Sequence, residues 1–119
     1  MDTRVTCSAS ALLDTWSAHA WTEGLQIETR QDMDRLIVQT ENSTYEITVI
    51  SARAGEILIR GGRFFPEFTP ARLAGSSLGG SFLKLRGIYV GFNLEVHFDS
   101  RLIITSRVRQ ISTAEYSTK

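Results

Sequence analysis

The sequence predicts a mainly β fold, a small closed or nearly closed antiparallel barrel of about six strands with a short N-terminal helix or tail. From residue 35 onward, short runs in which apolar and polar residues alternate are separated by turn residues, which is typical of consecutive β-strands. Glycine stands between several of these runs, where bends and bulges supply the curvature that closes a sheet. The length of 119 residues fits a single domain.

We expect three parts along the chain: a helix or partly ordered tail at residues 1–24, the small β-barrel domain at residues 25–112, and a C-terminal tail at residues 113–119. The first part lacks the alternation that marks the second. No internal repeat or low-complexity tract divides the chain further.

The N-terminal part contains one helical pattern. Leu12, Leu13, Trp16 and Ala20 recur at spacings of three and four residues, which favours a short amphipathic helix, with a partly ordered tail as the alternative. Trp16 and Trp21 then either anchor this part on the barrel or contact a partner. We favour anchoring, because exposing large aromatic surface to water is costly.

Three strands are expected before the middle of the chain. Runs at residues 36–40 and 44–49, joined by the polar turn 41–43, predict a hairpin. A turn that ends at Gly55 leads into the third run, residues 57–59.

The later strands follow the same pattern. A fourth strand is expected from Phe82 to Val90, with a bulge at Gly87, and Gly91 ends it. The last hairpin joins residues 92–98 to a strand that begins at Leu102. Its first strand has an apolar face of Phe92, Leu94, Val96 and Phe98 and a polar face of Asn93, Glu95 and His97.

Between the third and fourth strands, residues 61–83 hold both prolines, five of the nine glycines and four of the six phenylalanines. Proline removes a backbone donor and glycine relaxes the backbone, so we interpret the segment as a shaped loop carried by the β scaffold. Its candidate binding residues, with the arginine that precedes it, are Arg60, Arg63, Phe64, Phe65, Phe68, Arg72 and Ser77.

Three interpretations of this aromatic loop remain open. Phe64, Phe65 and Phe68 plug the open end of the barrel, or they form an exposed patch that pairs with a second copy of the chain. In the third interpretation, the phenylalanines form a platform on which the bases of single-stranded nucleic acid stack. This platform is flanked by Arg60, Arg63 and Arg72.

The net charge is zero, yet residues 1–50 carry three basic and eight acidic side chains, and residues 51–119 carry ten basic and five acidic ones. Either the acidic segment folds back on a basic face, or both are solvated, or the basic face meets a phosphate backbone. A sequence pI of about 6.7 is low for a nucleic-acid-binding domain. The basic residues concerned are Arg60, Arg63, Arg72, Lys84, Arg86, Arg101, Arg107 and Arg109.

The sequence contains partial matches to catalytic motifs, but the residues around each match do not fit the motif. Residues 75–79 match the GxSxG string, which would expose Ser77 as a nucleophile, but a strand follows where that motif needs a helix. His97 with Asp99 is a common surface arrangement, and no lysine follows Gly80 as a phosphate loop requires. Two histidines and one cysteine, in separate segments, do not predict a metal site. We expect no catalysis, cofactor or metal.

Cys7 is the only cysteine, so no intrachain disulfide forms and a reducing compartment is the default. No apolar run resembles a signal peptide or reaches the length of a membrane span, so we expect a cytoplasmic protein with no membrane partner. The glycosylation triplet that begins at Asn42 is interpreted as part of the hairpin turn.

Two resemblances accompany these patterns. The string RGGRFFPEFTPARLAGSSLGGSFLKL, followed by RGIYVGFNLEV and ITSRVRQI, resembles short uncharacterised bacterial proteins with a one-domain β core, over about residues 35–111. Residues 77–80, an apolar strand, Gly91 and the hairpin that follows are similar to the second half of PilZ domains, six-stranded barrels that bind cyclic di-GMP. The second resemblance implies a cyclic-dinucleotide site. Gly75 stands where PilZ domains have an acidic or amide residue, and their arginine pair is absent.

Together these observations predict a non-catalytic binding or interaction domain that self-associates, as a homodimer, through the aromatic loop. The alternative is binding of nucleic acid or a cyclic dinucleotide on the arginine-rich face of the barrel.

Overall fold

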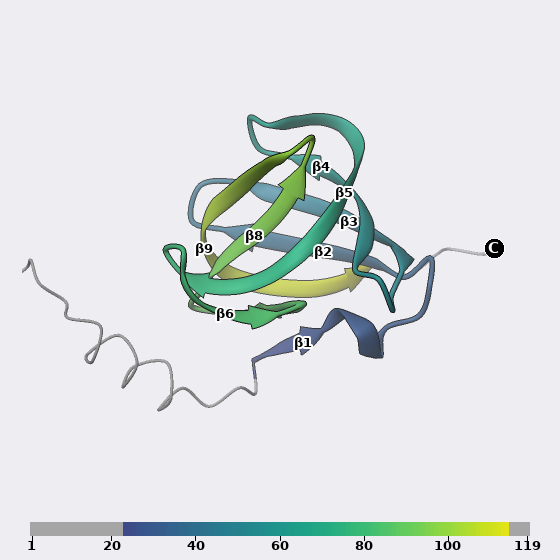
Figure 1. Cartoon of the computed structure of the whole chain (residues 1–119), viewed down its shortest axis with the longest axis horizontal. Helices are drawn as coiled ribbons and strands as arrows, with labels where there is room; N and C mark the ends of the chain where they lie inside the picture. Colours follow the sequence, from purple (N-terminus) through teal and green to yellow (C-terminus); the bar gives the residue numbers. More distant parts are fainter. Residues whose placement is uncertain (1–22, 115–119) are drawn as a thin grey trace, which may run out of the picture.

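The computed structural model describes residues 23–114, which are almost entirely β-strand and turn (Figure 1). One single-turn 3-10 helix, η2 (Ile27–Thr29), interrupts the strands. The strands are β1 (Gly24–Gln26), β2 (Arg35–Thr40), β3 (Thr44–Ser51), β4 (Glu56–Gly61), β5 (Phe65–Leu78), β6 (Ser81–Leu85), β7 (Gly87–Tyr89), β8 (Asn93–Phe98) and β9 (Arg101–Ala114).

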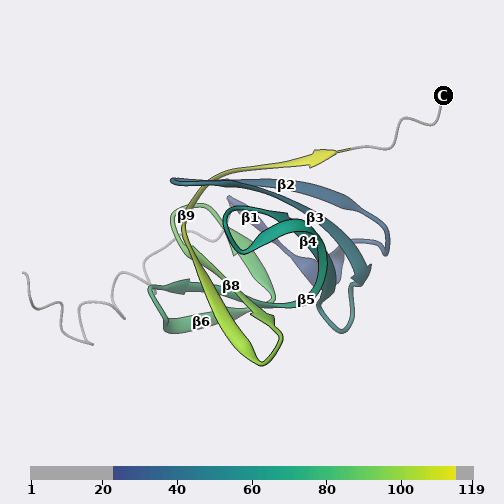
Figure 2. The same ribbon diagram turned by 90° about the horizontal axis from the view of Figure 1, so that it is seen from above.

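Six antiparallel strands form a ring. Their order is β4-β3-β2-β9-β8-β5, and β5 pairs again with β4. Strand β6 extends the sheet beyond β5, and β1 pairs with β7 in a separate two-stranded ribbon. Figure 2 shows β5 and β9 as the long strands that curve around the ring. The predicted mainly β, antiparallel fold of about six strands is confirmed. The expected N-terminal helix, with Trp16 and Trp21, lies outside the described residues.

The inner side of the ring is packed with the alternating apolar residues of its strands, as the period of two requires. In the first hairpin, Leu36 and Val38 on β2 face Tyr45, Ile47 and Val49 on β3. The remaining buried apolar side chains include Ile57, Ile59, Phe65, Leu73, Leu94, Val96, Ile103 and Val108.

The segment expected to be a loop is a strand instead. Strand β5 runs for 14 residues through both prolines. Over residues 65–71 it pairs only with β4. Pro66 has no register partner, so the strand loses no hydrogen bond of the ladder through the missing N–H of this proline. The glycines of the segment lie in turns or at close crossings of neighbouring strands, where Gly61 approaches Thr44 and Gly75 approaches Lys84. Gly79 and Gly80, both at positive φ, make the two-residue turn from β5 into β6.

The expected fourth strand is divided in two. Arg86, at a φ of 58°, turns the chain between β6 and β7, so Gly87 begins a strand and is not a bulge. The backbone N–H of Ile27 donates to the Arg86 carbonyl at 2.8 Å, which fastens the β1–β7 ribbon beside β6. Strand β9 continues to Ala114, two residues into the expected tail.

Candidate functional site

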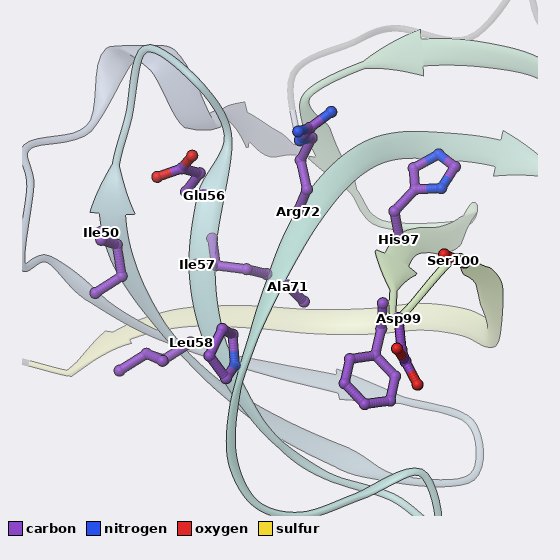
Figure 3. A pocket seen from close by; sticks show the side chains of 11 residues that line it. Ile50, Glu56, Ile57, Leu58, Ala71, Arg72, His97, Asp99 and Ser100 are labelled. Carbon is purple, nitrogen blue, oxygen red and sulfur yellow. The ribbon is translucent and has the colours of Figure 1, made fainter.

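A cleft of about 670 Å³ opens where β5 leaves β8 to follow β4 (Figure 3). Arg72 marks this point, because it is the register partner of both Glu56 on β4 and His97 on β8. Toward Phe65, β5 has only β4 beside it, and the tip of the β8–β9 hairpin forms the facing wall. The cleft is lined by the apolar residues Ile50, Ile57, Leu58, Pro70, Ala71 and Phe98 and by the polar residues Glu56, Arg72, His97, Asp99 and Ser100.

The walls of the cleft are apolar and backed by the core. Leu58 is the register partner of Pro70, and Ile57 of Ala71, so β4 and β5 both contribute to the lining. The first pair lies on the outer face of the two strands, and Ile57 of the second pair is buried in the core. Phe98 packs edge-on against the buried Phe65, with ring centroids 5.5 Å apart and an interplanar angle of 77°. Packing of this kind holds an aromatic wall in place.

Two cationic or donor groups stand at the rim. Arg72 and His97 are exposed, and Figure 3 shows them extending from neighbouring strands to the same side, whereas Asp99 points elsewhere. Neither Arg72 nor His97 forms an ion pair with a carboxylate in the part of the chain that the structure describes. Their hydrogen-bond donors are therefore available to a ligand in the cleft.

Three of the predicted binding residues share the outer face of β4 and β5. Arg60 donates from Nε to Oε1 of Glu46 at 2.7 Å, and its guanidinium lies 4.3 Å from the centre of the Phe68 ring. Arg72 lies on the same face, beyond Leu58. The guanidinium of Arg60 is thus held by Glu46 and the Phe68 ring, whereas Arg72 stands exposed at the rim of the cleft.

Arg63 and Phe64 belong to the turn between β4 and β5. They line a second cavity of about 420 Å³ together with Tyr45, whose hydroxyl lies close to Gly62. Burial raises the pKa of the Tyr45 phenol, and a hydrogen bond with Ser43 opposes this in part. The five exposed members of the predicted set therefore fall into two places, the outer face of β4 and β5 and the turn between these strands.

Two of the predicted binding residues, Phe65 and Ser77, have fully buried side chains. The Ser77 hydroxyl donates to the Glu95 carboxylate and accepts from the Gly80 backbone N–H at 3.1 Å. This arrangement fastens the β5–β6 turn to β8. Ser77 faces Asn93 and His97 faces Arg72, four residues or roughly 13 Å along β8, so no serine–histidine pair forms.

Glu95, which the sequence placed on the polar face of its strand, is buried. Only 6% of the residue is exposed. Its register partner on β5 is Gly75, which has no side chain, so the Glu95 carboxylate reaches Ser77 across the strand. The two residues are 18 positions apart in the sequence, and alternation within β8 gives no sign of the contact.

The basic residues are spread over several elements. Arg60, Arg72, Lys84 and Arg107 lie on β4, β5, β6 and β9, respectively. Arg109 on β9 approaches Glu41, with Nη1 and Oε2 3.8 Å apart. Binding of nucleic acid or a cyclic dinucleotide stays a prediction.

Models of protein families, curated proteins and solved structures were compared with the chain, and none of the three comparisons finds a match. Within residues 23–114, no three histidine, cysteine, aspartate or glutamate side chains gather where they would hold a metal ion. The same range contains no helix of the length and apolarity needed to cross a membrane.

Proposed function

We propose that this protein is a non-catalytic binding domain whose cleft holds a small amphipathic anion, a molecule with an apolar body and one carboxylate or phosphate group. The observation that carries the proposal is the cleft of about 670 Å³, which has apolar walls. Arg72 and His97 stand at its rim, and the carboxylates of Glu56 and Asp99 also line it. Its volume lies in the range of about 300–1,000 Å³ typical of ligand pockets, which combine apolar walls with a few polar groups.

The two parts of the ligand contribute unequally. Each buried CH₂ group is worth about 0.8 kcal/mol, so an eight-carbon chain gains several kcal/mol from the walls. An exposed ion pair with Arg72 adds about 0.2–1 kcal/mol. The apolar body therefore sets the affinity, and the rim selects the head group. Association itself costs at least about 4 kcal/mol, so we expect weak binding by simple probes, on the order of 1 mM.

Three probes separate these contributions: octanoate has both parts, octanol lacks the charge and acetate lacks the chain. The full chain is titrated with each and followed by amide chemical shifts. We expect octanoate to bind about 1.4- to 5-fold more tightly than octanol, because an exposed ion pair is worth about 0.2–1 kcal/mol. Acetate should not bind.

The variant Arg72→Met keeps an apolar stem and removes the charge. It should reduce octanoate affinity to the level of octanol and leave octanol binding unchanged. Arg107→Met, an exposed arginine on β9, is the matched control and should change neither. Equal effects of the two variants, or no shift of any cleft amide with octanoate, would contradict the proposal.

A further inference from the structure

The second cavity, of about 420 Å³, lies where three segments that are far apart in the sequence meet. It is lined by residues 42, 43 and 45 at the β2–β3 turn, by residues 63–64 of the β4–β5 turn and by residues 104–106 of β9. Its volume is typical of a ligand pocket, for which the range is about 300–1,000 Å³. The cleft and the second cavity have no lining residue in common, so they are separate candidate sites.

The charge at the second cavity is positive. Arg63 is exposed, and its guanidinium forms no ion pair with a carboxylate of residues 23–114. No aspartate or glutamate lines the second cavity, whereas two carboxylates line the cleft. Of the acidic residues next to the lining, Glu41 accepts from the Arg107 backbone N–H at 3.4 Å, and Glu46 accepts from Arg60 Nε at 2.7 Å. The charge of Arg63 therefore favours an anionic ligand.

On the β9 side, the hydroxyl groups around the second cavity satisfy one another. Ser106 Oγ donates to Thr40 Oγ1 at 2.8 Å and accepts from the Asn42 backbone N–H at 3.1 Å. Thr105 Oγ1 donates to the Ser106 carbonyl at 2.6 Å and accepts from the Leu94 N–H at 3.1 Å. These bonds fasten the β2–β3 turn to β9. Because the hydroxyl protons are already used, other groups must recognise a ligand.

The donors that remain for a ligand come from Asn42, Tyr45 and Arg63. Burial raises the pKa of the Tyr45 phenol, so its hydroxyl stays protonated at neutral pH and is able to donate. The Asn42 side chain is exposed, and its amide offers two donors and one acceptor. The guanidinium of Arg63 is planar and presents several N–H groups at once, which matches the geometry of a phosphate.

Two apolar side chains are exposed at the same cavity. Phe64 is 46% exposed and Ile104 is 40% exposed, and they come from the β4–β5 turn and from β9. The ring of Phe68 is covered by the guanidinium of Arg60, 4.3 Å from its centre, whereas no ring or guanidinium of residues 23–114 covers Phe64. The face of Phe64 is thus accessible to a flat ring, which stacks on an aromatic side chain.

We propose that the second cavity binds a mononucleotide, with the phosphate at Arg63, the base stacked on Phe64 and the edge of the base at Asn42. A nucleotide carries the three features that these groups recognise: an anion, a flat ring, and an edge with both hydrogen-bond donors and acceptors. A sugar phosphate lacks the ring, and an aryl phosphate lacks the edge. Adenine suits Asn42, because an asparagine amide forms two hydrogen bonds with it.

Titration of the full chain with adenosine monophosphate at low ionic strength, followed by amide chemical shifts, is the first test. The shifts should saturate and should be largest at residues 42–45, 63–64 and 104–106. Adenosine, which lacks the phosphate, should bind about 1.4- to 5-fold more weakly. Ribose 5-phosphate cannot stack and should bind at least about fivefold more weakly. Phenyl phosphate should also bind more weakly than adenosine monophosphate, because its ring has no hydrogen-bonding edge.

Substitutions at the two sites should act independently. Arg63→Met should lower the affinity for adenosine monophosphate to that for adenosine and leave octanoate binding unchanged. Arg72→Met, the matched control at the rim of the cleft, should leave binding of adenosine monophosphate unchanged. Phe64→Ala, on an exposed turn, should weaken binding of adenosine monophosphate at least about fivefold.

Absence of a saturable shift with adenosine monophosphate, or equal effects of Arg63→Met and Arg72→Met on its affinity, would overturn the assignment of this site. Binding of ribose 5-phosphate or phenyl phosphate as tight as that of adenosine monophosphate would overturn the choice of a nucleotide. Octanoate binding is measured separately and involves other residues, so a failure here is distinguishable from a failure of the function proposed for the cleft.

Discussion

The two halves of β5 belong to different surfaces of the molecule. Residues 65–71 have one neighbouring strand, contain both prolines and present Phe68 to solvent. Residues 73–78 lie between β6 and β8, and Leu73, Ser76 and Ser77 among them are buried. Within one continuous strand, the number of neighbours decides which residues are accessible to a ligand.

This difference separates a binding role from a structural one. The first half of β5 forms a wall of the cleft together with β4. The second half holds β6, β7 and β8 together. There the Ser76 hydroxyl donates to the Gly87 carbonyl at 2.8 Å and accepts from the Tyr89 N–H at 3.0 Å. Substitutions in the two halves should therefore have different consequences.

The largest expected effect concerns the exception within the first half, Phe65, which points into the core. Phe65→Ala should lower the free energy of unfolding by about 3–5 kcal/mol, because it leaves a cavity against Phe98. Phe64→Ala, its exposed neighbour, should change it by less than about 0.5 kcal/mol. Urea denaturation measures both. Similar losses would mean that Phe64 also supports the core.

Substitution of Gly75, where β6 passes close to the second half of β5, should destabilise the fold nearly as much. Gly75 has a φ of 147°, and a Cβ atom there would lie 2.1 Å from the Lys84 carbonyl oxygen on β6. Gly75→Ala should cost about 1–3 kcal/mol in backbone strain alone, with the displacement of β6 in addition. Gly79→Ala, at positive φ but with open space around it, should cost about 1–2 kcal/mol. If Gly79→Ala proved the more destabilising in thermal unfolding, the close crossing would be wrong.

The buried hydroxyl of Ser77 should have an intermediate effect. Ser77→Ala leaves the Glu95 carboxylate without its hydrogen-bond donor and should cost about 1–3 kcal/mol in chemical denaturation. Adding Glu95→Gln should recover part of this loss, since a neutral amide is less costly to bury. Ser100→Ala at the exposed β8–β9 turn is the control. Strictly additive effects of the Ser77 and Glu95 substitutions would argue against a direct contact.

The smallest effect is confined to alkaline pH. Burial raises the pKa of both Tyr45 and Tyr89, and a coulombic contribution from Glu28 raises that of Tyr89 further. A group whose pKa is higher in the folded state stabilises the fold below its unfolded pKa of about 10, and this stability is lost as pH rises through the folded value.

Each tyrosine reports on a different half of β5. Tyr45 packs against the turn that precedes the first half, and the backbone N–H of Tyr89 donates a hydrogen bond to Ser76 in the second half. Tyr45→Phe and Tyr89→Phe should each flatten the fall of the melting temperature above about pH 10. An unchanged alkaline profile in both variants would show that neither phenol is buried in solution.

Local alternation predicted most of the ring, because a period of two depends only on neighbouring residues. The hairpin of β2 and β3 and the inward face of β8 were predicted on that basis and are confirmed. Strand β5 was not predicted, because its proline and glycine suggested a loop. Pro66 is tolerated there because it has no register partner, and Gly75 because β6 passes too close for a side chain. The burial of Glu95 also depends on long-range pairing, which local sequence does not show.

The candidate site was only partly predictable. Arg72 was identified from its place in an unusual segment, but the cleft exists because β5 changes neighbours at that residue. Leu58, Pro70 and Phe98 come together through this change, and nothing in the local sequence around each indicates it. Apolar and polar residues do not alternate over residues 65–72, and the two prolines there favour a loop, so local sequence carried no sign of a strand with a free edge.

Mapping of octanoate binding by amide chemical shifts on the full chain tests the division of β5 most directly. We expect the largest shifts on Leu58, Ala71, Arg72 and His97, and no shifts at residues 76–78. Shifts centred on residues 76–78, or no saturable shift on either half, would contradict the assignment of the cleft to the first half of the strand.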